Sequence, residues 1–261
     1  MNGARGTKRK WTRDETILAF ELYCTLPSSN FTATNPRVIE LSRATMHPVG
    51  SVKAMLENFK SFDPDYVKDG RVGLGHGSKL TEQVATAFID NWDDLVWETK
   101  RIREGYGVKP LQEPEFYIGE FIIPEGRSIE RVTKVRYGQT FFRNSLLANY
   151  EGKCCITGLA MPRLLRASHI KPWKDSNDIN EKTNPQNGLL LNAFFDSAFD
   201  KGYITVSQDH EVVLSSEIKK LADERTRSYF ETYEGQKIRE PTRFRPEKHF
   251  IEYHNEHVFI E

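Results

Sequence analysis

The segment at residues 166–202 decides how the second half of the chain folds, and it reads RASHIKPWKDSNDINEKTNPQNGLLLNAFFDSAFDKG. His169 closes a short apolar stretch, and after a polar loop Asn187 precedes a glycine and an apolar run. Asp196 and Asp200 lie one helical turn apart near the end of that run. A neutral imidazole can take a proton from water near neutral pH, and carboxylate oxygens suit Mg²⁺ or Ca²⁺ better than zinc. The segment therefore combines a candidate base with a candidate metal site.

The residues around these side chains predict a hairpin followed by a helix. Residues 153–158 (KCCITG) and 163–170 (RLLRASHI) have the composition of two paired strands, and Pro172 ends the second one. Residues 188–200 (GLLLNAFFDSAFD) predict a helix on which Asn192, Asp196 and Asp200 would share one stripe.

Each of these features also has a purely structural interpretation. The polar stripe can be the solvated face of an amphipathic helix, and a single histidine at a strand end is usually a structural residue. Two carboxylates one turn apart repel by ~0.2–0.5 kcal/mol, which is weak support for a cation between them. The combination of a strand-end histidine, an irregular loop and a carboxylate-bearing helix favours the chemical interpretation.

The charge distribution indicates an anionic partner, although the net charge of the chain is zero. Residues 131–175 carry nine Lys or Arg and two Asp or Glu, a net charge of +7, whereas residues 81–130 carry five and eleven, a net charge of −6. The basic block leads into the opening segment, and such a patch is expected beside a phosphate backbone. A solvated protein surface remains the alternative interpretation of the charges alone.

The bulk composition limits the class of protein. A chain of 261 residues with 38% hydrophobic residues can form one large domain or two modest ones. No apolar run approaches the ~20 residues that a membrane span needs, and residues 1–11 lack the apolar centre of a secretory signal. Three cysteines do not make a disulfide framework, so we expect a cytoplasmic protein without a membrane partner.

The N-terminal part, residues 1–105, predicts a helical domain. Residues 12–26 begin with a capping box at Thr12, residues 35–46 place Asn35 at a cap before Pro36, and residues 51–63 end before Pro64. Residues 80–105 predict one long helix. Three short helices with tight turns suggest a helix-turn-helix-like unit for target recognition, with residues 51–60 (SVKAMLENFK) as its recognition helix. A small helical bundle that binds no DNA is the alternative.

The composition changes in residues 106–133, which are rich in proline, glycine and acids and predict a linker with one strand at residues 116–123 (FYIGEFII). Residues 134–261 form the predicted second domain. A helix is expected at residues 137–150, and residues 202–206 (GYITV) and 211–215 (EVVLS) predict a closing hairpin.

The motif ASHIKPW, followed by NPQNGLLLNAFFDSAFDKGYITV and preceded by CCITG, resembles the HNH endonucleases, which share the ββα-metal fold. It is similar to the HNH nucleases of bacterial restriction systems, and the preceding VRYGQTFFRNSLLANYEGKCCITGL also resembles the segment that leads into their motif. The resemblance covers roughly residues 136–206. It implies an α+β fold class, with the N-terminal helical domain joined to a C-terminal ββα-metal HNH domain.

The resemblance also implies a role for each residue of the opening segment. His169 would be the general base that activates water, and Asn187 would brace the loop and orient that histidine. Asp196 stands where the family has a metal-binding His or Asn, and Asp200 matches a further ligand of some members. Ser168 stands where an Asp or His often binds the metal, so its hydroxyl either replaces that ligand or only orders water.

The cofactor that the resemblance implies is Mg²⁺ or Mn²⁺. Many members also carry two Cys-x-x-Cys pairs on zinc, but here Cys154 and Cys155 are adjacent and no second pair exists. We therefore expect no structural zinc site and interpret these two cysteines as small core residues.

The implied substrate is double-stranded DNA, hydrolysed at a phosphodiester bond to leave a 5′-phosphate and a 3′-hydroxyl. The cations that flank the site are candidates for phosphate contacts: Arg143, Arg163, Arg166, Lys171 and Lys174, with weaker support for Arg136 and for the amide of Gln139. A restriction enzyme that cuts both strands often works as a homodimer, although no surface in the sequence proves one.

Two other functions fit the sequence less well. Ser168 and Asp196 depart from the usual ligands, so a DNA-binding protein with a degenerate HNH site is the main alternative. An RNA-directed or toxin-type nuclease is a weaker one, because the helical N-terminal domain and zero net charge suit a regulated DNA enzyme better.

Overall fold

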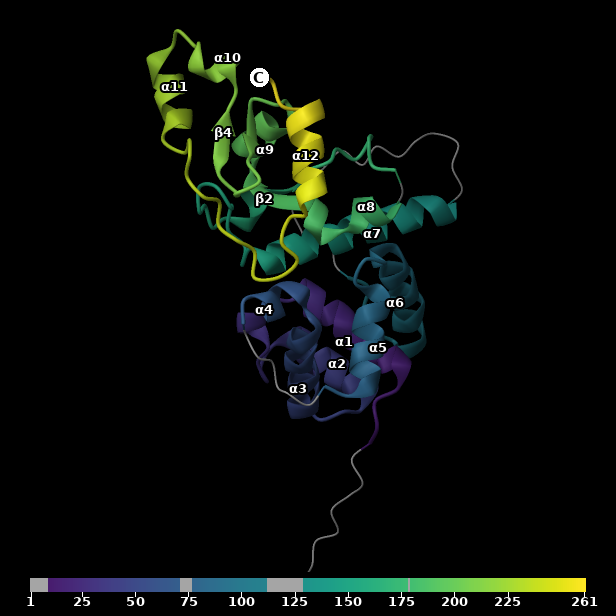
Figure 1. Ribbon diagram of the computed structural model, residues 1–261. Coiled ribbons are helices and arrows are strands. Elements are labelled where there is room, and N and C mark those ends of the chain that lie inside the picture. Colours follow the sequence, from purple (N-terminus) through teal and green to yellow (C-terminus); the bar gives the residue numbers. More distant parts are fainter. Residues whose placement is uncertain (1–8, 71–76, 112–128, 178) are drawn as a thin grey trace, which may run out of the picture.

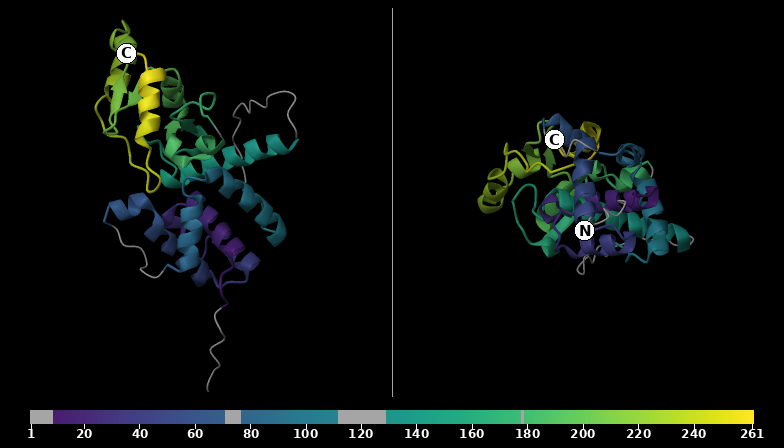
Figure 2. Two further views of the ribbon diagram at one scale, coloured as in Figure 1. Left: turned by 45° about the vertical axis from the view of Figure 1, so that its right-hand side comes forward. Right: turned by 90° about the horizontal axis from the view of Figure 1, so that it is seen from below.

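The computed structural model describes residues 9–70, 77–111, 129–177 and 179–261 (Figure 1). A helical part built from the first half of the chain lies below a mixed part built from the second half, and helix α7 runs between them (Figures 1 and 2). The helices are α1 (Arg13–Thr25), α2 (Pro36–Thr45), α3 (Val49–Phe59), α4 (Pro64–Lys68), α5 (Lys79–Phe88), α6 (Trp92–Tyr106), α7 (Ile129–Asn149), α8 (Ile179–Thr183), α9 (Ala193–Asp200), α10 (Ser216–Lys219), α11 (Glu224–Glu231) and α12 (Lys248–His257), and the strands are β1 (Leu165–His169), β2 (Gly188–Asn192), β3 (Ile204–Val206) and β4 (Val212–Leu214).

The helical part forms much as its sequence predicts. Thr12 and Glu15 make the predicted capping box at the start of α1, and Asn35 caps α2 before Pro36 at its first turn. The predicted recognition helix forms as α3, which packs on α1 and α2. Its role in target recognition stays a prediction.

The single long helix predicted at residues 80–105 is wrong. The chain breaks into α5 and α6 at Asp90, whose backbone φ is +74°. The apolar period continues through this break, so the periodicity that predicts the helix cannot locate the break. A left-handed backbone at a non-glycine residue is uncommon, and the sequence around Asp90 gives no sign of it.

The ββα unit forms with a different pair of strands from the predicted one. Strand β1 pairs antiparallel with β2, from Leu165 opposite Asn192 to His169 opposite Gly188. Residues 153–158 form turns instead of a strand, and the predicted helix at residues 188–200 begins only at Ala193. Asn192 is therefore not on a polar helical stripe. Its side-chain Oδ1 accepts hydrogen bonds from Phe194 N and Phe195 N and caps α9.

The run of leucines in β2 explains this error. Leu189, Leu190 and Leu191 are all buried, because helices α7 and α9 both pack against the hairpin. A short, continuous apolar run fits a fully buried strand as well as a buried helix, and its periodicity does not distinguish the two.

Helix α7 is longer than the predicted helix at residues 137–150 and contributes to two hydrophobic cores. Phe141 belongs to the core of the helical part, whereas Phe142 and Leu146 belong to the core of the mixed part. Leu147, on the same helix, is partly buried at the edge of the second core. Cys154 and Cys155 are buried there, as predicted.

The closing hairpin is confirmed, with β3 paired to β4. The predicted strand at residues 116–123 lies outside the described residues, and the predicted linker at residues 106–133 overlaps the last residue of α6 and the first turn of α7. Among the helices that the structure describes, none is both long and apolar enough to cross a membrane.

A short strap, residues 243–245, leaves the mixed part and enters the helical part. The Arg243 side chain is buried, donates hydrogen bonds to the carbonyls of Tyr23 and Leu26 at the end of α1, and lies 4.5 Å from the Tyr23 ring centroid. Phe244 adopts a φ of +51° and packs edge-on against Trp92 in the core of the helical part. The core of the first half of the chain therefore includes a side chain from near the other end of the sequence.

Candidate active site at the end of the hairpin

His169 is the last residue of β1 and lies against helix α7. Its imidazole stacks on Phe142 at 4.0 Å between ring centroids and 7° between planes, and the Trp173 ring meets it edge-on at 5.5 Å. The partner strand has a glycine at this point, because a Cβ on Gly188 would lie 2.6 Å from Phe142 Cζ and 2.7 Å from Leu146 Cδ1. Gly188 thus lets α7 approach closely enough to support the histidine ring.

The hydrogen bond of His169 fixes its tautomer. Nε2 lies 3.0 Å from the carbonyl oxygen of Lys182, and a carbonyl can only accept, so Nε2 carries the proton. Nδ1 then has a lone pair, and it has no hydrogen-bond partner among the residues that the structure describes. Burial lowers the pKa of His169 to about 4, which keeps the ring neutral near neutral pH. A neutral, oriented imidazole with one available nitrogen can accept a proton from water.

Asn187 holds the two ends of the loop that joins β1 to β2. Its side-chain Oδ1 accepts a hydrogen bond of 2.8 Å from Lys171 N, and its Nδ2 donates to the carbonyls of Lys171 and Glu181. The side chain is fully buried, so these bonds replace the water that it loses. Asn187 does not touch His169 by any of these bonds, but it fixes the loop from which Lys182 holds the histidine.

The carboxyls of Asp196 and Asp200 lie on the other face of the hairpin, next to Ser168. Burial raises the pKa of Asp196, with Ser168 and Arg166 acting in the opposite direction. Desolvation and the neighbouring Asp196 raise the pKa of Asp200 to about 6, although the residue as a whole is exposed. Desolvation is the largest cause of both shifts, so the ionised form of each carboxyl is disfavoured at this site.

Ser168 is 3% exposed, and its hydroxyl makes no hydrogen bond of normal geometry to any described residue. It nevertheless lies near enough to Asp196 and Asp200 to lower the pKa of both. The predicted metal residues thus come together in space, and His169 lies at the same end of β1 on its opposite face, as neighbouring strand residues do.

These three oxygen-bearing side chains fit a hard divalent cation. Two carboxyls that repel each other and a buried hydroxyl without a well-formed hydrogen bond are donors that a cation would satisfy together. Across the described ranges, no group of three or more His, Cys, Asp or Glu side chains is placed to hold a metal ion. The remaining ligands would be water and substrate oxygens, a sharing that is usual for Mg²⁺.

The predicted phosphate-contacting cations divide into two groups. Arg143 and Lys171 are buried: Arg143 donates to the carbonyls of Leu165 and Pro162, and Lys171 pairs with Glu181 at 2.8 Å. These contacts support the start of β1 and the loop after it. Arg163, Arg166 and Lys174 are exposed or partly exposed near the two ends of β1, where a phosphate backbone could reach them.

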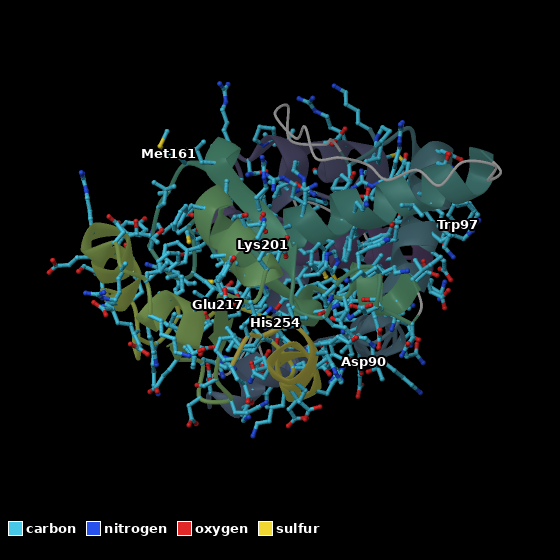
Figure 3. The ribbon with its side chains drawn as sticks, turned by 90° about the horizontal axis from the view of Figure 1, so that it is seen from above. Asp90, Trp97, Met161, Lys201, Glu217 and His254 are labelled. Carbon is cyan, nitrogen blue, oxygen red and sulfur yellow. The ribbon has the colours of Figure 1, made fainter. Side chains whose placement is uncertain are left out.

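Sequence reasoning missed residues that act through their backbone or from distant segments. The Lys182 backbone carbonyl orients His169. Every residue has a carbonyl, so the side chain at position 182 gives no sign of this role. Lys201 follows Asp200 and lowers the pKa of both carboxyls. His254 lies on α12 (Figure 3). It donates from Nε2 to the carbonyl of Phe199, one residue before Asp200. The only sequence signal for a buried His254 is its helical spacing from the apolar residues of the same amphipathic helix.

Comparison with known proteins agrees with this geometry. Residues 154–207 match the model of a family described as HNH endonuclease. The match includes the hairpin, its loop, helix α9 and strand β3, and it supports an HNH nuclease, for which DNA is the implied substrate and a divalent metal the general cofactor. A comparison with curated proteins finds no match.

Proposed function

We propose that the chain is a metal-dependent DNA endonuclease of the restriction type, in which the helical part selects the target and the mixed part cuts it. The HNH match at residues 154–207 is the premise. The observation that carries the proposal is the state of His169, a neutral imidazole whose Nε2–H is bonded to Lys182 and whose Nδ1 is available.

In the proposed reaction, His169 Nδ1 takes a proton from a water molecule that attacks the scissile phosphorus. The Lys182 carbonyl and the Phe142 ring keep the imidazole in place while it gains charge. Arg166 and Arg163 would hold the flanking phosphates, which fixes the register of the strand but carries no sequence information. The P–O3′ bond breaks, leaving a 5′-phosphate on one product and a 3′-hydroxyl on the other.

Ser168, Asp196 and Asp200 would hold the metal, for which Mg²⁺ or Mn²⁺ is the proposed identity. When bound, such an ion neutralises charge on the phosphate and on the departing oxygen. The protein's own part is to keep the two carboxyls one turn apart on α9 and to aim them at the end of β1.

The phosphate contacts proposed from the sequence need different roles in this scheme. Arg163, Arg166 and Lys174 remain proposed DNA contacts. Arg143 and Lys171 instead support the loop, because their charged groups are already bonded to backbone carbonyls and to the Glu181 carboxylate. Replacing either of these two should lower stability more than it weakens DNA binding at fixed salt.

The test is cleavage of supercoiled plasmid with Mg²⁺, Mn²⁺ or no divalent ion, on methylated and unmethylated DNA. We expect metal-dependent nicking or linearisation that His169→Ala abolishes. Binding of duplex DNA without cleavage under every metal condition would instead favour a DNA-binding protein with a degenerate site, the alternative that Ser168 supports.

A further inference from the structure

Helix α8, Ile179–Thr183, lies between the candidate active site and the helical part. It packs on α6 of the helical part and on α7, as Figure 1 shows. Thr183, at its end, lies so close to α7 that a Cβ on Gly138 would be 2.7 Å from Thr183 Cγ2. A helix of five residues has little stability of its own, so its position depends on these neighbours.

The side chain of Asn180 anchors the start of α8 in the helical part. Its Oδ1 accepts hydrogen bonds from Trp92 N at 2.7 Å and Asp93 N at 3.4 Å, and its Nδ2 donates to the Asp90 carbonyl at 2.7 Å. These are the free amides at the start of α6, where Asn91 makes no capping bond of its own to a described residue. A residue from the mixed part therefore caps a helix of the helical part.

The next two residues of α8 hold the candidate base and its loop. The Lys182 carbonyl accepts from His169 Nε2, and the Glu181 carbonyl accepts from Asn187 Nδ2. The Glu181 carboxylate also pairs with Lys171. Asn180 therefore contacts the helical part, and the next two residues, Glu181 and Lys182, bond to Asn187 and His169.

We propose that Asn180 is a positioning residue, through which the helical part sets the orientation of the His169 imidazole. This inference rests on the proposed function for its kinetic consequence, but its geometric consequence is independent of any activity. If α8 loses its anchor on α6, the Lys182 carbonyl moves relative to Nε2, and the imidazole is no longer held with Nδ1 toward the substrate. A displacement of about 1 Å in such a group can slow a reaction about 100-fold.

The experiment compares Asn180→Ala with a matched control, Asn35→Ala, in the full chain. Asn35 caps α2 with the same kind of bond, to Arg37 N at 2.9 Å, but α2 is not part of the α8 contact. Each substitution should lower stability by about 1 kcal/mol, the usual loss for a helix cap. Circular dichroism and thermal unfolding establish first that both variants fold and lose comparable stability.

The first readout is the imidazole tautomer of His169, from the ¹⁵N shifts of histidine-labelled protein at neutral pH. We expect Asn180→Ala to change the His169 signals from a single Nε2–H form to a mixture of the two tautomers, and Asn35→Ala to leave them unchanged. The second readout is single-turnover cleavage, where Asn180→Ala should slow the step about 10- to 100-fold with little change in KM for DNA. Asn180→Asp, which can still accept from the two amides of α6, should recover most of the rate.

Two results would overturn the inference. One is a folded Asn180→Ala protein with the wild-type tautomer, and the other is equal loss of rate in Asn180→Ala and Asn35→Ala. If Asn180→Ala does not fold, Asn180→Gln is the test variant. It keeps the side-chain amide, but its extra methylene moves α8 away from α6. It should show the same tautomer mixture, and wild-type signals from it count against the proposal. A wild-type protein that cuts no DNA overturns the proposed function alone, since the tautomer still tests Asn180.

Discussion

The end of β1 and the middle of α12 hold their histidines in nearly the same way. His169 stacks on Phe142 at 4.0 Å and donates from Nε2 to a backbone carbonyl, and His254 stacks on Phe199 at 3.8 Å and does the same. Burial lowers the pKa of each to about 4. Ring stacking, tautomer and pKa therefore do not distinguish a candidate base from a structural histidine.

The second ring nitrogen makes the difference. His254 is 1% exposed, and its Nδ1 lies 2.8 Å from the Thr205 hydroxyl oxygen, so both nitrogens make polar contacts. His169 is partly exposed, and its Nδ1 has no partner in the described part of the chain. His169 therefore has one nitrogen fixed and the other without a partner among the described residues, whereas both nitrogens of His254 make polar contacts.

The largest expected effect separates these two histidines by rate. His169→Ala should reduce cleavage about 10²–10⁴-fold, the usual contribution of a general base. DNA affinity should barely change, because phosphate contacts carry most of it. The measurements are single-turnover cleavage with Mg²⁺ and duplex binding with Ca²⁺ in place of Mg²⁺, on protein whose fold has been checked. A folded His169→Ala variant that cuts at nearly the wild-type rate would remove the base assignment.

The second expected effect tests the pair of carboxyls on α9, Asp196 and Asp200. Asp196→Asn keeps the shape of the side chain but removes its charge, so the Mg²⁺ concentration for half-maximal cleavage should rise at least about 10-fold. Ser168→Asp should lower it, since a carboxylate is a better ligand than a hydroxyl. Asp209→Asn, at an exposed turn, is the matched control. Identical metal titrations for wild type and Asp196→Ala would exclude Asp196 as a ligand.

The third expected effect is on stability and concerns His254. His254→Gln keeps a polar side chain but loses the stacking on Phe199 and the fixed pair of bonds, which should cost about 1–3 kcal/mol of unfolding free energy. Thermal or urea unfolding measures this loss. The folded variant should still cut DNA at a rate within a few-fold of wild type, and a loss of rate as large as that of His169→Ala would break the distinction between the two histidines.

The last expected effect is the pH dependence of the difference in unfolding free energy between wild type and His254→Gln. His254 has a pKa near 4 when folded and about 6.5 when unfolded. On acidification the unfolded chain therefore binds the proton first, so the contribution of His254 is complete above pH ~6.5 and is lost as the pH falls towards ~4. The difference in unfolding free energy between wild type and His254→Gln should decrease by about 1–3 kcal/mol as the pH falls through this range. Urea unfolding at several pH values measures it, and a constant gap would contradict the lowered pKa.

The sequence predicts the candidate site better than the fold that surrounds it. His169, Asn187, Asp196 and Asp200 could be selected because their side-chain chemistry and spacing are visible in one continuous segment. Ser168, Asp196 and Asp200 do meet in space, and Asn187 does brace the loop. Their chemical roles remain predictions.

The errors arise where several conformations satisfy the same pattern. Leu189–Leu190–Leu191 is equally apolar as strand or helix, and only the presence of α7 and α9 on both sides selects the strand. Arg143 and Lys171 are cations of the kind that bind DNA phosphates. Their side chains instead bond to backbone carbonyls and to the Glu181 carboxylate, which lie 10 to 22 residues away in the sequence. Local pattern cannot reveal a partner that folding supplies from a distance.

The helical part illustrates the same limit. The caps at Thr12 and Asn35 are local and were predictable, because each lies within three residues of the amides it accepts from. The cap that Asn180 provides to α6 was not, since it joins positions 88 residues apart. The division into domains at residues 105 and 134 remains a prediction, and it does not capture the contributions of Phe141 and Phe244 to the first core.

The strap has a consequence for the order of events during synthesis. Arg243 bonds to Tyr23 across 220 residues of sequence, and Phe244 fills a place beside Trp92 in the core of the helical part. Helices near the N-terminus emerge first from the ribosome and can form early, but this core stays incomplete until the strap has been made. Contacts between such distant positions also slow folding. A nascent chain therefore cannot complete the core of its helical part before residues 243–244 have been made, so the two parts reach their native state together.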